Sequence, residues 1–501
     1  MKKRFLIIWS VLALLFTGCS DWLDINHDPD ALEEVPDAST LLPAAEVGIA
    51  NNLMGWDFGF GGGFWVEYWT QAYTSSQFKS LCEYLPEDFN NAYTSLLSQP
   101  QADLQLIKEM TEEDPNRGYY FVAEALSIFT WQLITDVWGD MPYFETLRGD
   151  ELLVNPEQDS GKDIYADLLK RVDELLAVDL SNSSIDGTQD FVYAGDLSKW
   201  HQFAAALKLK LMLRLSETPE YDNAAVLSFI QSADLLSESA KIPGSVWDDS
   251  MEGKRHPMRE FQAGGANYIS QNVRACKSFF DYLDENGDPR LANLFSGSEA
   301  AFFGDFDSKD DSDDDGTADD KESYATVVFP GNMDLMIMSD WEVNFYIAEV
   351  YARAGNNAKA KEYYEAAVMA SLAQHKITNS GILTGGYAKW KDGTTEEEIK
   401  QIAMQKWVAN CNYQHIESFL ERNRTKYPSV NEINIVADRN AAWDNFPVGE
   451  LTISVKGRAI LNGNLPASPL YPESYIFRNS NAPSQKPNVG QKVWWNQKSG
   501  K

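Results

Sequence analysis

An acidic stretch past the middle of the chain has the residue types and spacing of a calcium-binding loop. Residues 311–322 read DSDDDGTADDKE. A calcium loop of about twelve residues supplies oxygen ligands from its positions 1, 3, 5, 7, 9 and 12 and turns at a glycine in position 6, which Gly316 matches here. The predicted calcium ligands are Asp311, Asp313, Asp315, Thr317 (through its backbone carbonyl), Asp319 and Glu322.

The segments beside this loop differ from those of an EF-hand. Residues 302–307 (FFGDFD) and 324–330 (YATVVFP) lack helical periodicity. The alternative interpretation is a solvated acidic loop, since runs of like charge are usually exposed. If calcium binds, we expect it to hold a loop near a binding face, because so many carboxylates repel one another without an ion.

Sugar binding is a second chemistry that the residue types allow. Sugar C–H groups stack on flat aromatic rings, while amides, carboxylates and guanidinium groups bond the hydroxyls. The chain has 15 Trp, 22 Tyr and 25 Phe, and most of these must form the core. Aromatic residues in loops are therefore the better ligand candidates, in residues 55–84 and on both sides of the acidic stretch.

Patterns of catalytic residues are missing from the sequence. The five histidines, His27, His201, His256, His375 and His415, include no pair at i and i+4. Neither H-E-x-x-H nor G-x-S-x-G occurs, and the glycine-rich residues 55–63 do not fit a phosphate-binding loop. We predict a protein that is not an enzyme. A glycosidase needs two facing carboxylates, and with 75 acidic residues that alternative stays open.

The N-terminus has the three parts of a secretory signal. Residues 2–4 are basic, residues 5–16 are apolar except for Ser10, and Thr17 and Gly18 are small. The apolar run is shorter than the roughly 20 residues that span a membrane. Cleavage is therefore predicted after this segment.

Cys19 follows the small residues directly, which resembles a bacterial lipobox. In that motif the cysteine is lipidated and becomes the first residue, although Phe16 stands where Leu is commoner. We predict a signal peptide at residues 1–18 and a single lipoprotein domain at residues 19–501, anchored through Cys19. An ordinary signal that ends near a cysteine is the alternative.

Charge narrows the classes of ligand. The net charge is −33. Removing residues 1–18 takes three of the 42 basic residues and leaves 39 against 75 acidic ones, a net charge of −36. Such a surface repels nucleic acid and anionic lipid, so neutral sugars or peptides are expected. The remaining cysteines, Cys82, Cys276 and Cys411, are odd in number and predict buried thiols.

Helical patterns dominate the rest of the chain. Residues 117–138 are apolar nearly all round and predict a buried helix, and Asp196 is the predicted N-cap of a helix that ends near Leu215. A further helix is predicted from Glu396 to about Arg422. Residues 341–372 have the spacing of a tetratricopeptide repeat, with Ala348, Tyr351, Gly355, Ala360, Tyr364 and Ala367 at its positions.

These patterns predict a mostly α fold, in which tetratricopeptide-like helical repeats form a curved scaffold with long loops. Residues 55–63 (GWDFGFGGG) are predicted to be a loop. From Ala437 onward the chain is rich in Pro, Gly and Asn but keeps large apolar residues. We predict an extended C-terminal segment packed over the helices.

Six segments spread along the chain stand out as motifs: residues 24–30 (DINHDPD), 136–145 (DVWGDMPYFE), 193–214 (YAGDLSKWHQFAAALKLKLMLR), 286–290 (NGDPR), 402–428 (IAMQKWVANCNYQHIESFLERNRTKYP) and 466–472 (PASPLYP). In this order they resemble the motifs of the SusD/RagB family of outer-membrane nutrient-binding lipoproteins. Ala205, Ala206 and Ser468 depart from the usual Asn, Ser and Arg. We interpret these motifs as scaffold, with Glu417, Arg422 and Arg424 in buried ion pairs or in contact with a transporter.

The resemblance implies a helical, non-catalytic protein that binds oligosaccharides for a SusC-like TonB-dependent transporter in the outer membrane. The acidic residues after Cys19 resemble a surface-export signal, so surface exposure is expected. Peptide capture and a transporter lid without affinity of its own are alternatives, and a glycoside hydrolase is a weaker one. By analogy with the family, the predicted ligand-binding residues are Tyr73, Phe78, Phe303 and Tyr324.

Overall fold

A computed structural model describes residues 37–72, 75–149, 153–262, 268–305 and 324–501. The helices are α2 (Ala38–Leu53), α3 (Gly61–Trp65), α4 (Lys79–Glu83), α5 (Asn90–Leu96), α6 (Ala102–Thr111), α7 (Gly118–Trp138), α8 (Gly161–Leu176), α9 (Leu197–Arg214), α10 (Asn223–Ser232), α11 (Pro257–Glu260), α12 (Tyr268–Asn272), α13 (Lys277–Glu285), α14 (Leu291–Leu294), α15 (Asp340–Arg353), α16 (Asn357–Gln374), α17 (Gly381–Thr384), α18 (Thr395–Asn410), α19 (His415–Thr425), α20 (Arg439–Asp444) and α21 (Glu473–Arg478). The described residues also form two π-helices, η1 (Trp56–Phe60) and η2 (Leu97–Gln101), and the 3₁₀-helix η4 (Gly244–Val246).

Short strands form two-stranded pairs in the described residues. The antiparallel pairs are β1 (Trp69–Gln71) with β3 (Val273–Ala275), β2 (Ala240–Ile242) with β6 (Leu335–Met338), and β4 (Phe295–Ser296) with β5 (Thr326–Val327). The parallel pair is β7 (Val430–Asn431) with β8 (Leu451–Thr452). The predicted mostly helical fold is confirmed. Among the described residues, no helix is both long enough and apolar enough to cross a membrane.

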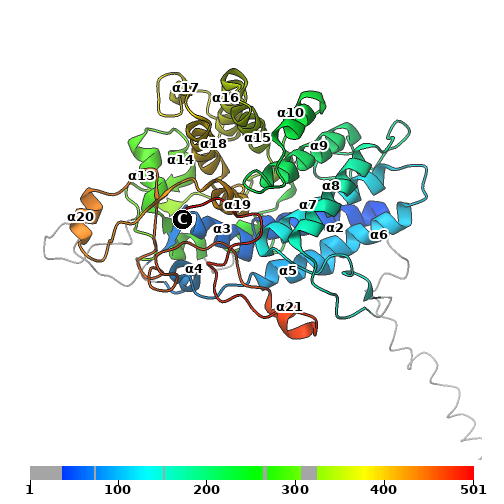
Figure 1. The fold of residues 1–501 in the computed structure, drawn as a ribbon, viewed down its shortest axis with the longest axis horizontal. Helices are drawn as coiled ribbons and strands as arrows, with labels where there is room; N and C mark the ends of the chain where they lie inside the picture. Colours follow the sequence, from blue (N-terminus) through cyan, green and yellow to red (C-terminus); the bar gives the residue numbers. More distant parts are fainter. Residues whose placement is uncertain (1–36, 73–74, 150–152, 263–267, 306–323) are drawn as a thin grey trace, which may run out of the picture.

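Helices α8, α9, α10, α15 and α16 lie side by side along one edge of the molecule (Figure 1). The predicted buried helix is α7, in which nearly every side chain is buried. The side chain of Asp196 caps α9 by accepting hydrogen bonds from the backbone N–H groups of Ser198 and Lys199, at 3.0 and 3.3 Å. Both of these sequence predictions are confirmed.

The predicted tetratricopeptide pair consists of α15 and α16. Gly355 makes the turn between them with φ +70°, a conformation that favours glycine. Ala348, Ala360 and Ala367 are fully buried, and their small side chains let the two helices pack closely. This prediction is also confirmed.

One predicted helix is instead two. The chain predicted to be helical from Glu396 to Arg422 breaks between α18 and α19, at residues 411–414. Asn412 takes φ +67°, and its backbone N–H donates to Nε2 of His415 at 2.8 Å. The imidazole satisfies a backbone group that the helix would otherwise bond, so the chain can reverse and pack α19 on α18.

The glycine-rich segment is not the predicted loop. Residues 56–65 form η1 and α3, which are mostly buried. A Cβ on Gly62 would lie 2.6 Å from the carbonyl carbon of His415 in α19. These glycines therefore allow a helix to approach another backbone, which is a packing role that local sequence does not distinguish from loop flexibility.

Charged side chains meet in the interior between α7, α9, α15, α18 and α19. We call this group the ion network, and it comprises Asp136, Lys210, Arg214, Glu342, Glu349, Lys406, Glu417, Glu421 and Arg424. Arg424 contacts Glu349 at 2.6 Å and Glu421 at 2.7 Å, and Arg214 contacts Glu417 at 2.6 Å. Buried ion pairs of Glu417 and Arg424 are thus confirmed.

Arg422 differs from the other two residues of that prediction. It is buried, but its guanidinium donates to the backbone oxygens of Pro428 and Lys501, at 3.4 and 2.6 Å. Arg422 therefore fastens the end of the chain to α19 rather than joining the ion network.

The C-terminal segment lies across the helices, as predicted (Figure 1). Trp495 is fully buried, and its indole N–H donates to the backbone oxygen of Asp136 at 3.2 Å. Lys486 is buried too and donates to the Ser468 hydroxyl at 3.0 Å, at the position where the family motif has Arg. The free thiols of Cys82, Cys276 and Cys411 are buried, as expected.

Candidate functional site

Several predicted site residues lie outside the described residues. These are Cys19, Tyr73 and the six predicted calcium ligands, Asp311, Asp313, Asp315, Thr317, Asp319 and Glu322. Among the described residues no group of acidic, histidine or cysteine side chains could hold a metal ion. The flanks of the acidic stretch, residues 302–305 and 324–330, are not helical where they are described.

Phe78 and Phe303 lie in the core. Each side chain is 1% exposed. The ring of Phe78 stacks on Phe60 with 4.5 Å between centroids, and Phe303 packs 6.0 Å from Tyr84. Both rings are covered by protein. Their contact with a ligand stays a prediction, and their burial does not favour it.

Tyr324 lies at a small aromatic cluster that also includes Trp443. The two rings stack at 6.2 Å, and the ammonium of Lys277 lies 4.1 Å from the centre of the Trp443 ring. Tyr324 is 8% exposed, whereas Trp443 is half-buried. The sequence analysis assigned Trp443 only to the C-terminal segment. It did not indicate the contact between Trp443 and Tyr324, because these residues are far apart in the chain.

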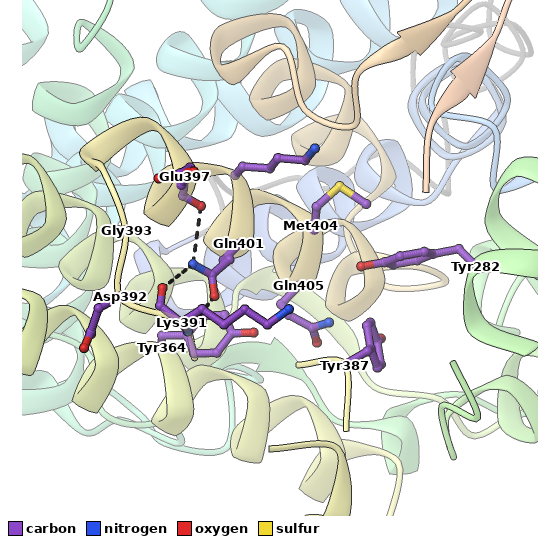
Figure 2. Close-up of a pocket in the computed structure, with 11 residues that line it drawn as sticks. Tyr282, Tyr364, Tyr387, Lys391, Asp392, Gly393, Glu397, Gln401, Met404 and Gln405 are labelled. Atoms are coloured by element: carbon purple, nitrogen blue, oxygen red, sulfur yellow. Dashed lines mark hydrogen bonds between the residues drawn. The ribbon is translucent and has the colours of Figure 1, made fainter. Parts of the chain in front are cut away.

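A hollow opens between α13, α16, α18 and the segment before α18. It has a volume of about 420 Å³. We call it the tyrosine pocket, and Figure 2 shows the side chains that line it. Its walls are Tyr282, Tyr364, Tyr387 and Met404, and its polar lining is Lys391, Asp392, Glu397, Lys400, Gln401 and Gln405.

The three tyrosines come from separate segments, and each has a defined orientation. Tyr282, on α13, meets the ring of Tyr387 edge-on, with centroids 5.3 Å apart and an angle of 90°. The hydroxyl of Tyr387 donates to Asp288 at 2.6 Å, and that of Tyr364 donates to the backbone oxygen of Ala388 at 2.8 Å. The rings are therefore fixed before any ligand binds.

The motif turn at residues 286–290 supports the base of this pocket. Arg290 is fully buried and contacts Asp288 at 2.6 Å. It also donates to the side-chain oxygen of Gln405 at 2.9 Å. Gln405 is 2% exposed, and its Nε2 has no hydrogen-bond partner among the described residues, so it is a donor available to a ligand.

The segment before α18 forms the rim of the pocket, and side chains of α18 hold its backbone in place. The side chain of Gln401 accepts from the backbone N–H of Lys391 at 2.9 Å and donates to its carbonyl at 2.7 Å. Glu397 forms a capping box with Thr394 at the start of α18. The hydrogen bonds between Gln401 and Lys391, visible in Figure 2, keep the segment before α18 against the helix.

The electrostatics of the pocket favour binding rather than acid–base chemistry. Burial raises the pKa of Tyr282, Tyr364 and Tyr387, so all three hydroxyls stay protonated. Hydrogen bonds from Thr394 lower the pKa of Glu397, which makes it a poor proton donor. The pocket thus combines flat apolar walls with amide groups and a balanced set of exposed charges.

Comparisons with known proteins agree with this architecture. A model of the SusD-like family, described as starch-binding and associating with the outer membrane, matches residues 29–445. A SusD homologue from Bacteroides uniformis has 21% identity and a TM-score of 0.68, and the match covers 91% of this chain and 99% of that one. No curated protein matches the chain.

Two further solved structures are similar. A SusD homologue from Bacteroides thetaiotaomicron has 19% identity and a TM-score of 0.69 over 93% of this chain and 100% of that one. A chitin-binding SusD homologue from Flavobacterium johnsoniae has 17% identity and a TM-score of 0.67 over 92% and 99%. At these identities the likeness establishes the fold, and the match to the family model covers every residue of the tyrosine pocket.

Proposed function

Since the chain belongs to the SusD-like family of starch-binding proteins that associate with the outer membrane, we propose that it captures neutral oligosaccharides in the tyrosine pocket and passes them to a SusC-like TonB-dependent transporter. SusD-like binding proteins are not catalysts, and the family resemblance read from the motifs is confirmed. The observation that supports the proposed site is the fixed set of three tyrosines beside the free amide nitrogen of Gln405.

The chemistry of the pocket supports a neutral sugar as the ligand. Each sugar ring has apolar C–H faces for Tyr282 and Tyr387 and hydroxyls for the amides. The rim has two lysines and two carboxylates, so no net charge selects an ionic ligand. The starch binding of the family and the chitin binding of one similar structure define the first two glycans to test.

We also propose that the protein is anchored to the outer membrane through a lipid on Cys19 and exposed at the cell surface. The proposal is supported by the signal pattern of residues 1–18 and by the family's association with that membrane. Calcium binding by residues 311–322 is a further proposal, supported by the match of this stretch to the calcium loop.

A binding screen of the chain without residues 1–19 tests the capture function. Calorimetry with starch and chitin oligosaccharides and with peptides would be combined with an assay for released products. We expect saturable binding to one class of glycan and no hydrolysis. Binding to peptides alone would favour peptide capture, binding to nothing would favour a transporter lid, and hydrolysis would favour a glycosidase.

A pair of variants tests the site. Tyr282→Ala removes one wall, and we expect affinity to fall about tenfold or more, as for other buried aromatic contacts. Phe477→Ala is the matched control, because this ring on α21 is 79% exposed and does not line the pocket. Equal affinities of the two variants would contradict the assignment of the pocket.

A further inference from the structure

A second hollow, of about 320 Å³, lies at the C-terminal end of α16. The tyrosine pocket contacts the same helix further back, at Tyr364. It is bounded by α14, by residues 328–334 before β6, by the C-terminal end of α16 and by the break between α18 and α19. We call it the amide pocket, after the side chains Asn293, Asn332, Gln374 and Asn412 that line it.

Two of these four amides are oriented by backbone carbonyls, and a third is oriented by a carboxylate. Asn293 donates to the carbonyl of His375 at 3.0 Å, and Asn412 donates to that of Val328 at 3.2 Å. Gln374 donates to Asp334 at 3.3 Å. Asn332 is exposed at the mouth. A ligand would therefore meet polar groups whose directions are largely set beforehand, which lowers the entropic cost of binding.

His375 lines the amide pocket, and its Nε2 is one of several buried polar atoms that have no hydrogen-bond partner among the described residues. Leaving such an atom unbonded is unfavourable, so a group that supplies the bond is favoured. Burial, with a smaller contribution from Arg290, lowers the pKa of His375 to about 4, so the ring is neutral near pH 7.

The two charged side chains that line the pocket, Asp334 and Lys376, have opposite signs, and together with the apolar wall they favour a ligand without net charge. The carboxylate of Asp334 is paired with Lys241 at 2.7 Å and accepts from the backbone N–H of Gly244 at 2.8 Å. The ring of Tyr413 meets His375 edge-on at 5.5 Å and forms part of the wall. Amides and a neutral imidazole can each donate and accept, which suits hydroxyl groups that do the same.

We propose that the amide pocket is a second contact site for neutral sugar units, separate from the tyrosine pocket. This inference rests on the proposed glycan capture and adds a site to it. The two pockets are linked through α16, which places Tyr364 in one and Gln374 in the other. Ten residues of helix separate them by about 15 Å. A disaccharide is shorter than this separation and therefore occupies one pocket at a time, so a chain with both sites binds two molecules.

Calorimetric titration with a disaccharide of the class found in the screen tests this site. Asn332→Trp places a bulky ring at the exposed mouth without disturbing the core, and His375→Phe keeps a ring but removes both nitrogen atoms. We expect two molecules bound by the wild-type chain and one by each variant, with the affinity of the remaining site unchanged. Tyr282→Ala should remove the other site and leave this one.

The outcomes separate the two proposals. One molecule bound per wild-type chain, with binding lost in Tyr282→Ala and unchanged in both amide-pocket variants, overturns the second site but not glycan capture. No binding of any glycan by the wild-type chain overturns both. Thermal unfolding of each variant identifies any loss of binding that comes from misfolding, and Asn332→Trp remains informative if His375→Phe is unstable.

Discussion

Helix α18 contributes side chains to both the ion network and the tyrosine pocket. The two regions differ in whether their polar side chains are paired with other protein groups. Lys406 points into the network, where it contacts Glu421 at 2.7 Å, while the neighbouring Gln405 lines the pocket. In the network each charge has an opposite charge beside it. In the pocket Gln405 keeps a free donor, and three aromatic rings face an open volume. One helix thus supports a closed scaffold on one side and a surface able to bind on the other.

This difference teaches where mutations should have their effect. A buried charge without its partner is strongly destabilising, whereas a ring beside an open hollow has fewer buried contacts to lose. We therefore expect substitutions in the ion network to alter mainly stability and substitutions in the tyrosine pocket to alter mainly affinity.

The largest expected effect is on stability, from Arg424→Ala. The variant leaves Glu349 and Glu421 buried without this guanidinium, so the free energy of unfolding should fall by about 3–5 kcal/mol. Urea unfolding measures the change. Lys359→Ala is the control, because it breaks an exposed ion pair with Glu362 and should leave the midpoint unchanged. Similar midpoints for both variants would show that the network adds little stability.

The pH dependence of stability should identify Glu349 as part of the network. Although burial raises its pKa, Arg424 and Arg353 lower it to about 2, from 4.5 in the unfolded chain. An acid whose pKa is depressed on folding stabilises the protein above its unfolded pKa and loses that contribution as pH falls toward the folded pKa. The stability difference between wild type and Glu349→Gln should therefore be largest near pH 7 and shrink below about pH 4.5.

Urea unfolding at a series of pH values provides the measurement. The comparison with Glu349→Gln is needed because other buried acids act in the opposite direction. Burial raises the pKa of Glu67 to about 7, so the stability that it contributes falls as pH rises toward that value. A difference that stays constant from pH 7 to pH 3 would contradict the assignment for Glu349.

Removal of calcium tests whether the acidic residues 311–322 bind this ion. Residues 311–322 contain a single lysine, so we propose that a calcium ion balances their charges, whereas arginines and lysines do so in the ion network. We expect calcium at a hundred times its Kd to add about 2.7 kcal/mol of stability. Chelator should lower the Tm of the wild type and not that of a chain with Asp311→Asn and Asp313→Asn. Equal shifts in both would contradict the calcium proposal.

The smallest expected effect comes from Tyr387→Phe. The variant keeps the ring at the pocket but loses the hydrogen bond to Asp288, which should cost about 1–2 kcal/mol of stability. Affinity should fall less than in Tyr282→Ala, because the ring surface remains. Tyr351→Phe is the control, since that hydroxyl has no hydrogen-bond partner among the described residues. A loss of affinity as large as that of Tyr282→Ala would indicate that the hydroxyl contacts the ligand.

Local sequence patterns were sufficient for elements whose stability is local. The cap at Asp196 and the turn at Gly355 depend on residues within one helical turn, and the apolar residues 117–138 had to be buried. The same reasoning failed for residues 55–63, because glycine serves both flexible loops and close helix contacts. It also failed at residues 411–414, where the break depends on His415.

By itself the sequence determined the family and the mostly helical fold, since these depend on motif order and periodicity. It left Glu417 and Arg424 open between buried ion pairs and contacts with a transporter, and the structure places both in buried ion pairs. Only the tertiary structure decided where a ligand could bind. Tyr282, Tyr364 and Tyr387 lie in three separate segments, and nothing in their immediate neighbours differs from core residues. Their common pocket exists because α13, α16 and α18 pack around a buried Arg290, and such long-range packing has no local signal.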